Sequence, residues 1–174
     1  SPGVIGDEAD CRIPAPPSVK LFAPTRLVRV LHVINGEHFS GAERVQDLLA
    51  GYLPACGYEV GFACVKPGRF PDARKFRDAA LYPVPMRSRL DFSCGRKLAS
   101  LLRDEQFSII HAHTPRALMV ADQAARLAKV PLVYHVHSPA GRDSTRWFRN
   151  MANAWLERHA AHRASRLIAV SPSV

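Results

Sequence analysis

From Arg26 onward, short apolar runs alternate with stretches whose apolar residues recur at helical spacing. The first run, Val28–Ile34, is nearly continuous and rich in β-branched residues, which is typical of a strand buried on both faces. Similar runs predict further strands over 59–65, 81–85, 107–111, 132–137 and 167–170. Helical spacing predicts helices after Ser40 and over 92–105, 116–129 and 145–164, with a short one over 72–80. Strands that alternate with helices predict an α/β fold, a doubly wound and mostly parallel sheet of Rossmann-like type with right-handed crossovers.

The two ends of the chain differ from this pattern. Residues 1–25 contain five prolines and little apolar periodicity, so they are expected to form a proline-rich, flexible N-terminal arm. Residues 26–174 are expected to form a single domain of ordinary size. The chain stops on Ser171-Pro172, a cap residue followed by the residue favoured at the first helical position. We therefore expect the chain to be a fragment of a longer protein.

The junction after the first strand has its own local chemistry. Asn35 and Gly36 break the apolar run, and Ser40 to Glu43 then spells S-G-A-E. This is a capping box, in which Ser40 can accept from the amide of Glu43 while the Glu43 side chain returns to the amide of Ser40. Amides at a helix N-terminus also attract anions. The junction is therefore either an ordinary capped turn or a phosphate-facing loop, and neither a G-x-G-x-x-G fingerprint nor a P-loop is present.

Charge narrows the class of partners. The net charge is +9, and because residues 1–25 carry −1, the remainder carries +10. A basic surface of this size favours nucleotide phosphates, acidic lipid headgroups or nucleic acid, although it is also compatible with a simply solvated surface. Nucleic acid is not expected as a partner, because the sequence has no aromatic-basic RNA motif and no zinc-finger spacing.

Composition also bears on the compartment. The apolar fraction of 47% suffices for a core, and the longest apolar runs are only strand-length, so no transmembrane segment is expected. The four cysteines show no C-x-x-C spacing, which favours free thiols in a reducing cytoplasm. A helix over 145–164 combines aromatic residues with arginines, so it either covers the sheet or lies on a membrane surface. We expect a cytoplasmic protein, with peripheral binding at the inner face of the membrane left open.

Two His-x-His pairs lie at predicted strand ends, His111-Ala112-His113 and His135-Val136-His137. Residues i and i+2 of a strand share a face, and the two strands are neighbours in this topology, so the imidazoles are expected to converge. Three interpretations compete. Imidazoles suit zinc, although no carboxylate follows either pair closely. His111 and His135 could instead close strand ends by bonding to backbone carbonyls. His113 and His137 could face a ligand, as neutral donors to sugar hydroxyls or to a developing phosphate charge.

Several segments, in order, resemble the N-terminal domain of glycosyltransferase family 4, the retaining enzymes of the two-domain GT-B fold. They are RVLHVI, SGAERVQDLLAGYLPACGYEV, FSIIHAH, VPLVYHVHS and RLIAVSPSV, and together they cover about Arg29 to Ser171. The resemblance implies one acceptor-side half of a GT-B enzyme. It also implies that a C-terminal donor-binding domain is absent from these 174 residues.

The resemblance also implies roles for individual residues. Gly41, with Ser40, stands in the loop that lies close to the donor phosphates and the acceptor. His113 stands at the edge of the acceptor cleft, and His137 stands where the family places a catalytic strand-end histidine that contacts the donor sugar. Glu43 matches the loop glutamate, for which capping of Ser40 is the simpler explanation. The family often has two glycines where this chain has Ser40-Gly41, and a serine there narrows the approach to the backbone while supplying a helix cap.

The implied function is transfer of a sugar from a nucleotide-diphosphate donor to a hydroxyl acceptor, such as a glycan, a glycolipid or a cell-envelope precursor. No metal and no cofactor are expected, because the nucleotide sugar is a substrate. The fragment by itself is expected to be inactive. Two alternatives remain: a non-catalytic Rossmann-like module that binds a nucleotide or a partner, and a His-ligated metal hydrolase.

Overall fold

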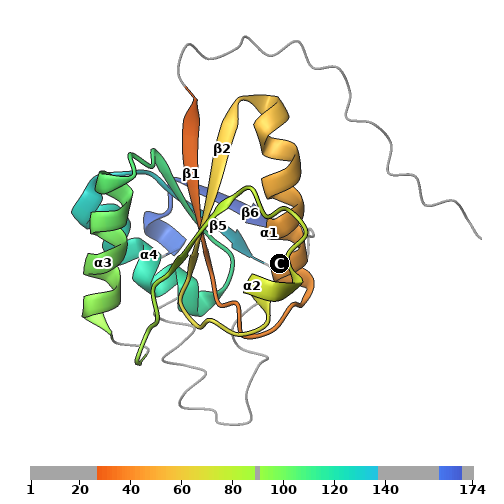
Figure 1. The fold of residues 1–174 in the computed structure, drawn as a ribbon. Helices are drawn as coiled ribbons and strands as arrows, with labels where there is room; N and C mark the ends of the chain where they lie inside the picture. Colours follow the sequence, from red (N-terminus) through yellow and green to blue (C-terminus); the bar gives the residue numbers. More distant parts are fainter. Residues whose placement is uncertain (1–26, 89–90, 137–160, 170–174) are drawn as a thin grey trace, which may run out of the picture.

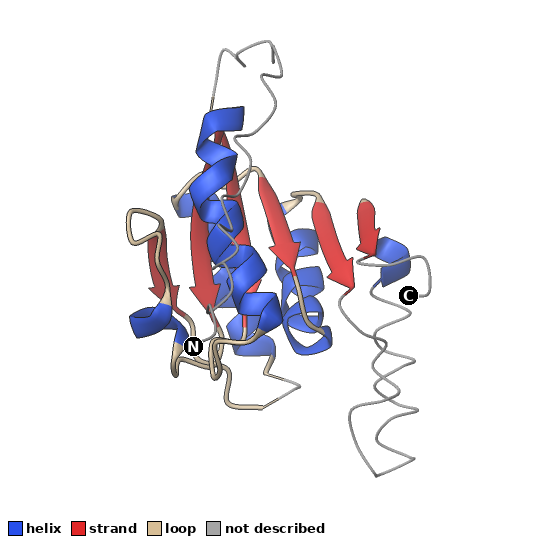
Figure 2. Cartoon of the chain, turned by 90° about the vertical axis from the view of Figure 1, so that its right-hand side faces the viewer, coloured by secondary structure: helices blue, strands red, loops and turns tan. Residues whose placement is uncertain are grey.

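The computed structural model describes residues 27–88, 91–136 and 161–169. Its strands form one sheet with the order β3-β2-β1-β4-β5-β6, and every neighbouring pair is parallel. The strands are β1 (Val28–Ile34), β2 (Tyr58–Cys64), β3 (Ala80–Pro83), β4 (Ile109–Ala112), β5 (Leu132–Val136) and β6 (Arg166–Ala169). All the arrows in Figure 2 point to the same edge of the sheet, which we call the carboxyl edge. The predicted doubly wound parallel sheet is confirmed.

Helices cover both faces of this sheet. They are α1 (Gly41–Tyr52), α2 (Phe70–Ala73), α3 (Phe92–Asp104) and α4 (Pro115–Ala128), with a 3₁₀ turn η1 (Leu53–Cys56) after α1. Helices α3 and α4 lie together on one face, whereas α1 lies on the other (Figure 1). Such coverage of both faces explains why the central strands are apolar at consecutive positions rather than alternating.

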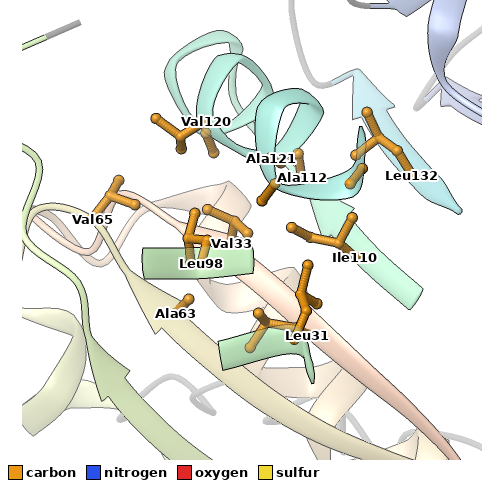
Figure 3. Packing of buried hydrophobic residues seen from close by; sticks show 14 of the residues in the cluster. Leu31, Val33, Ala63, Val65, Leu98, Ile110, Ala112, Val120, Ala121 and Leu132 are labelled. Atoms are coloured by element: carbon orange, nitrogen blue, oxygen red, sulfur yellow. The ribbon is translucent and has the colours of Figure 1, made fainter. Parts of the chain in front are cut away.

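The larger core lies between the sheet and the α3–α4 pair (Figure 3). Leu31 and Val33 of β1 point into it together with Ile110 of β4, and all three side chains are fully buried. Leu98 of α3 reaches the same cluster, and α4 contributes a row of small residues that lets it approach closely. Each fully buried aliphatic side chain of this kind contributes about 1.5–3 kcal/mol, so this face supplies most of the apolar stabilisation.

The opposite face has a smaller apolar cluster built on Ile34, Phe62 and Phe70. Among the described residues, Ala50 is the one side chain that α1 contributes to this cluster. The other buried positions of α1 are polar: they are Glu43, Gln46 and Asp47. Helix α1 is therefore held to the sheet in part by polar contacts.

The strand order creates a place for a ligand. The chain moves outward from β1 through β2 to β3, and then returns to lay β4 on the other side of β1. The loops that follow β1 and β4 consequently leave the carboxyl edge in opposite directions. This switch point is where open α/β sheets bind their ligands.

Two elements differ from the expectation. The short helix spans Phe70–Ala73 rather than 72–80, because Pro71 suits its first turn and the buried Phe70 ring fixes its start. Most of the helix predicted over 145–164 lies outside the described residues. The structure describes its last part, where residues 161–163 are helical. Within the described part of the chain, none of the helices has the length and apolar character needed to cross a bilayer.

Candidate functional site

The loop after β1 is the first wall of the site. Gly36 adopts φ +79°, and a Cβ at this position would lie 2.3 Å from the sulfur of Cys64, so the tight turn requires glycine. The backbone amides of Lys66 and Phe70 donate to the carbonyls of Asn35 and Gly36 at 2.8 and 3.1 Å. The loop is thus fixed to the end of β2 before it reaches α1.

Helix α1 begins directly after this loop, with Ser40 as its N-cap and the capping box present. The Glu43 carboxylate accepts from the backbone amide of Ser40 at 3.2 Å, and the Ser40 hydroxyl donates to it at 2.5 Å. Gly41 differs from most of the other described glycines: a Cβ built on it would meet no atom within 4 Å. The first turn of α1 therefore has open space beside its backbone.

The loop after β4 is the second wall. Thr114 caps α4 by accepting from the amide of Ala117 at 3.2 Å, and its hydroxyl donates to the side-chain oxygen of Asn35 at 3.4 Å. This contact joins the end of β4 to the loop after β1. Since His113 immediately precedes Thr114, the structure places His113 beside the loop that leads to Gly41.

Four imidazoles pack against one another on the α1 side of the sheet. We call His32, His111, His113 and His135 the histidine cluster. His32 of β1 is the register partner of His111 of β4, and His113 and His135 extend the same face towards the carboxyl edge. Ring centroids are 4.1 Å apart for His111 and His113 and 5.1 Å apart for His113 and His135. The predicted convergence of His111, His113 and His135 is confirmed.

Within the histidine cluster, Nδ1 of His32 lies 3.2 Å from Nε2 of His113, at hydrogen-bonding distance. His32 is fully buried and His113 is almost so. Burial, followed by the charges of His111 and His135, holds the pKa of His32 well below its ordinary value of 6.5. His32 is consequently a neutral imidazole at physiological pH.

Cations gather near the first wall. Lys66 forms an ion pair with Glu37 in the loop after β1. The Lys66 side-chain contact, together with the charges of Lys66, His38 and Arg116, lowers the pKa of the Glu37 carboxyl. Lys66 follows β2 and Arg116 lies in the first turn of α4, so two cationic side chains lie near this edge of the sheet, with Lys66 paired to Glu37. Such a setting favours an anionic group, a phosphate in particular.

The three cysteines in the described part of the chain offer no reactive thiolate at this edge. Cys56, Cys64 and Cys94 are free thiols. Burial raises the pKa of both the Cys64 and the Cys94 thiol to about 11, so neither forms a thiolate at neutral pH.

Sequence reasoning identified much of this edge but not His32. Gly41, Ser40 and His113 lie along the two walls, and Glu43 is engaged with the cap. His137 lies outside the described residues. A histidine between the apolar residues Leu31 and Val33 was the available signal for His32, and pairing of β1 with β4 brings it level with His111.

Known proteins resemble this chain in sequence. A sequence model of Glycosyltransferase Family 4 matches residues 39–174. A UDP-Gal:alpha-D-GlcNAc-diphosphoundecaprenol alpha-1,3-galactosyltransferase of Escherichia coli is 30% identical over 147 residues. The matched region covers 81% of this chain and 38% of that enzyme, so the chain spans well under half the length of its relative.

Solved structures resemble it in fold. MurG of Acinetobacter baumannii matches with a TM-score of 0.65 at 12% identity, over 83% of this chain and 42% of that one. HepE of Anabaena, solved in complex with UDP, matches with a TM-score of 0.64 at 23% identity, over 83% of this chain and 38% of that one. At these identities the likeness bears on the fold alone, and it agrees with the doubly wound architecture.

Proposed function

Because the chain belongs to glycosyltransferase family 4, we propose that it forms the N-terminal, acceptor-side half of a retaining GT-B glycosyltransferase. The enzyme would move a sugar from a nucleotide-diphosphate donor to a hydroxyl acceptor. Since the chain spans 38% of its E. coli relative, the donor-binding half is proposed to come from chain outside these 174 residues. Transfer would then need both halves closed over the donor.

The observation that carries this proposal is the open space at Gly41 beside the cationic carboxyl edge. Backbone amides in the first turn of a helix bind phosphate when nothing blocks their approach. Gly41 leaves that approach open, and the Ser40 hydroxyl is turned to Glu43 by the cap. We propose that the donor diphosphate lies against this turn, with Ser40 and Gly41 at its side.

Two histidines are proposed to lie at the substrate site. His113, at the end of β4, is proposed to lie at the edge of the acceptor cleft, and His137 is proposed to orient the donor sugar. The acceptor hydroxyl would attack the anomeric carbon on the face from which the nucleotide diphosphate leaves. Transfer is proposed to need no metal ion, because amides and cations of the protein would meet the charge of the leaving diphosphate.

The relative's name suggests the substrate class. That enzyme uses UDP-Gal and a diphosphoundecaprenol-linked sugar. We propose a UDP-sugar donor and a lipid-linked acceptor for this chain as well. A lipid-linked acceptor requires access to a membrane, and the net charge of +9 supports peripheral binding to an anionic, cytoplasmic membrane face.

A substitution at Gly41 tests the phosphate-facing turn. Gly41→Val adds bulk where the fold has room, so the thermal midpoint should change little. The same bulk would displace the diphosphate by about 1 Å, which should lower kcat/KM by about 100-fold in the full-length enzyme with a UDP-sugar. Ala55→Val, in the exposed turn η1 at the opposite edge, is the matched control and should leave transfer unchanged.

If Gly41→Val transferred sugar normally, the first turn of α1 would not be part of the donor site. If the full-length wild-type protein bound UDP but transferred no sugar to any lipid-linked acceptor, the chain would be a nucleotide-binding module rather than part of an enzyme. The 174-residue chain alone is expected to show no transfer.

His137 provides a second test. His137→Ala in the full-length enzyme should reduce kcat by at least about 100-fold, because a group that contacts the donor sugar in the transition state would be lost. His162→Ala removes an exposed histidine that lies outside both walls of the site and serves as the control. Near-normal kcat for His137→Ala would exclude His137 from the reaction.

A further inference from the structure

We propose that His32, His111 and His113 form a binding site for a d-block divalent cation, Zn²⁺ above all. One nitrogen from each of the three residues can be chosen so that all three lie within 4.8 Å of one another. The three side chains are buried, and they come from neighbouring central strands of the sheet. The site shares His113 with the edge of the proposed acceptor cleft, but because His113 is almost fully buried a metal bound to it would not contact the acceptor.

The geometry suits a tetrahedral ion. Zinc binds imidazole nitrogen at about 2.0–2.1 Å, which places two tetrahedral ligand atoms about 3.3 Å apart. Nδ1 of His32 and Nε2 of His113 are already 3.2 Å apart. A metal between these two nitrogens would replace their hydrogen bond. The ring that donates the hydrogen bond would move its proton to its other nitrogen, so that both facing nitrogens could bind the metal through a lone pair.

The chemistry of the donors selects the kind of metal. All three ligands are imidazoles, which suit Zn²⁺, Co²⁺, Ni²⁺ and Cu²⁺ but not Mg²⁺ or Ca²⁺. The set contains no carboxylate, which separates it from hydrolytic centres that combine histidines with Asp or Glu. Because all three imidazoles are buried, a metal at this position would be structural or regulatory rather than open to a substrate.

His135 is the fourth imidazole of the histidine cluster and lies beside this group of three. The His135 ring centroid lies 5.1 Å from that of His113 and 6.0 Å from that of His111. A site with three or four imidazoles from β1, β4 and β5 would join the central strands at their carboxyl ends.

Cobalt reports on such a site directly. The metal-free 174-residue chain, titrated with Co²⁺, should take up one equivalent and develop the intense visible bands of a tetrahedral, nitrogen-ligated ion. One equivalent of Zn²⁺ should remove these bands. Weak octahedral bands, or a near-ultraviolet charge-transfer band from thiolate ligands, would overturn the proposal.

Substitutions assign the ligands. His32→Asn keeps a polar atom near Nδ1 but removes the imidazole, and it should weaken Co²⁺ binding by more than the 10–100-fold typical of losing an outer-shell partner. His38→Asn and His162→Asn change exposed histidines outside the cluster and should leave the affinity unchanged. Full binding by His32→Asn, or equal loss in the controls, would refute the site.

X-ray absorption spectroscopy identifies the atoms that bind zinc in the wild-type chain. It therefore tests the site without depending on whether the variants fold. Three or four imidazole ligands at about 2.0 Å would support the site. A shell made mainly of sulfur or of water oxygen would refute it.

Discussion

His32 is a neutral imidazole inside β1, between the apolar residues Leu31 and Val33. Its ring lies 4.8 Å from that of His111 and 5.3 Å from that of His113, centroid to centroid. Burial is the larger cause of its low pKa, and the charges of His111 and His135 add to it. His32 therefore binds a proton less readily in the folded chain than in the unfolded chain, so the free energy of unfolding depends on pH.

The sign of this linkage follows from the proton count. Below about pH 6.5 the unfolded chain protonates His32 whereas the folded chain does not. The free energy of unfolding should accordingly fall as pH drops below 6.5, by up to about 1.4 kcal/mol per pH unit for this group. Urea unfolding with a chelator present, at intervals between pH 7.5 and 5, measures the slope.

Two variants identify the source of that slope. His32→Asn should flatten it, because the titrating group is gone. His38→Asn should leave it unchanged, since that side chain is exposed. An equal slope in wild type and His32→Asn would show that other groups carry the pH dependence.

The sequence pattern located the two His-x-His pairs, but it did not reveal that His32 lies beside them. His111 and His113 share a face because strand residues alternate, and adjacency of β4 and β5 follows from the topology. Pairing of His32 with His111 depends on the register between β1 and β4, which arises from packing of the whole sheet. Periodicity within one strand carries no information about that register.

At the scale of elements, α3 and α1 show what periodicity can and cannot predict. Helix α3, predicted from its apolar spacing, buries residues at that spacing, with Leu98 and Leu102 fully buried. Helix α1 was predicted from apolar spacing, yet Leu48 and Tyr52 are each 41% exposed. Asp47 faces inward instead, where its carboxylate accepts from two backbone amides of the connection after α2. That connection has no regular pattern, so the sequence held no sign of the contact.

The N-terminus of α3 offers a prediction at this scale. Asp91 accepts from the amides of Ser93 and Cys94 at 3.0 and 3.3 Å. The Ser93 side chain, followed by the Arg87 amide, lowers the pKa of the Asp91 carboxyl to about 2. Asp91→Ala should lower the Tm by about 2–4 °C at pH 7, because the helix loses its cap.

The effect should shrink as pH falls from 3.8 towards 2, since protonation of Asp91 weakens the cap in wild type too. Asp104→Ala, at the other end of α3, is the control. Removing a negative charge near a helix C-terminus should leave the Tm unchanged or raise it slightly. Equal losses of Tm at both ends would argue against a capping role for Asp91.

At the scale of the whole molecule, one ion pair ties the last described segment to the rest. Arg163 donates to both oxygens of Asp122 in α4, at 3.1 and 2.7 Å. The Asp122 side chain is only 7% exposed, so its charge depends on this partner. The contact positions residues 161–163 just before β6 joins the sheet.

Comparing two arginines tests this anchor. Arg163→Ala should cost about 1–3 kcal/mol in the free energy of unfolding, because it leaves a buried carboxylate with poorer pairing. Arg126→Ala removes the more exposed arginine that lies 3.5 Å from the same carboxylate and should cost no more than about 0.5 kcal/mol. Chemical denaturation followed by circular dichroism measures both, and equal costs would contradict a special role for Arg163.

The polar inner face of α1 has a consequence for motion. A helix that contributes Ala50 to the apolar cluster, and buries mainly polar side chains such as Asp47, can detach locally while leaving most of the core intact. Its amides should therefore exchange with deuterated water sooner than those of α4. Gly41 is the first residue of this helix. The turn proposed to bind the phosphate would therefore take part in the local opening of α1.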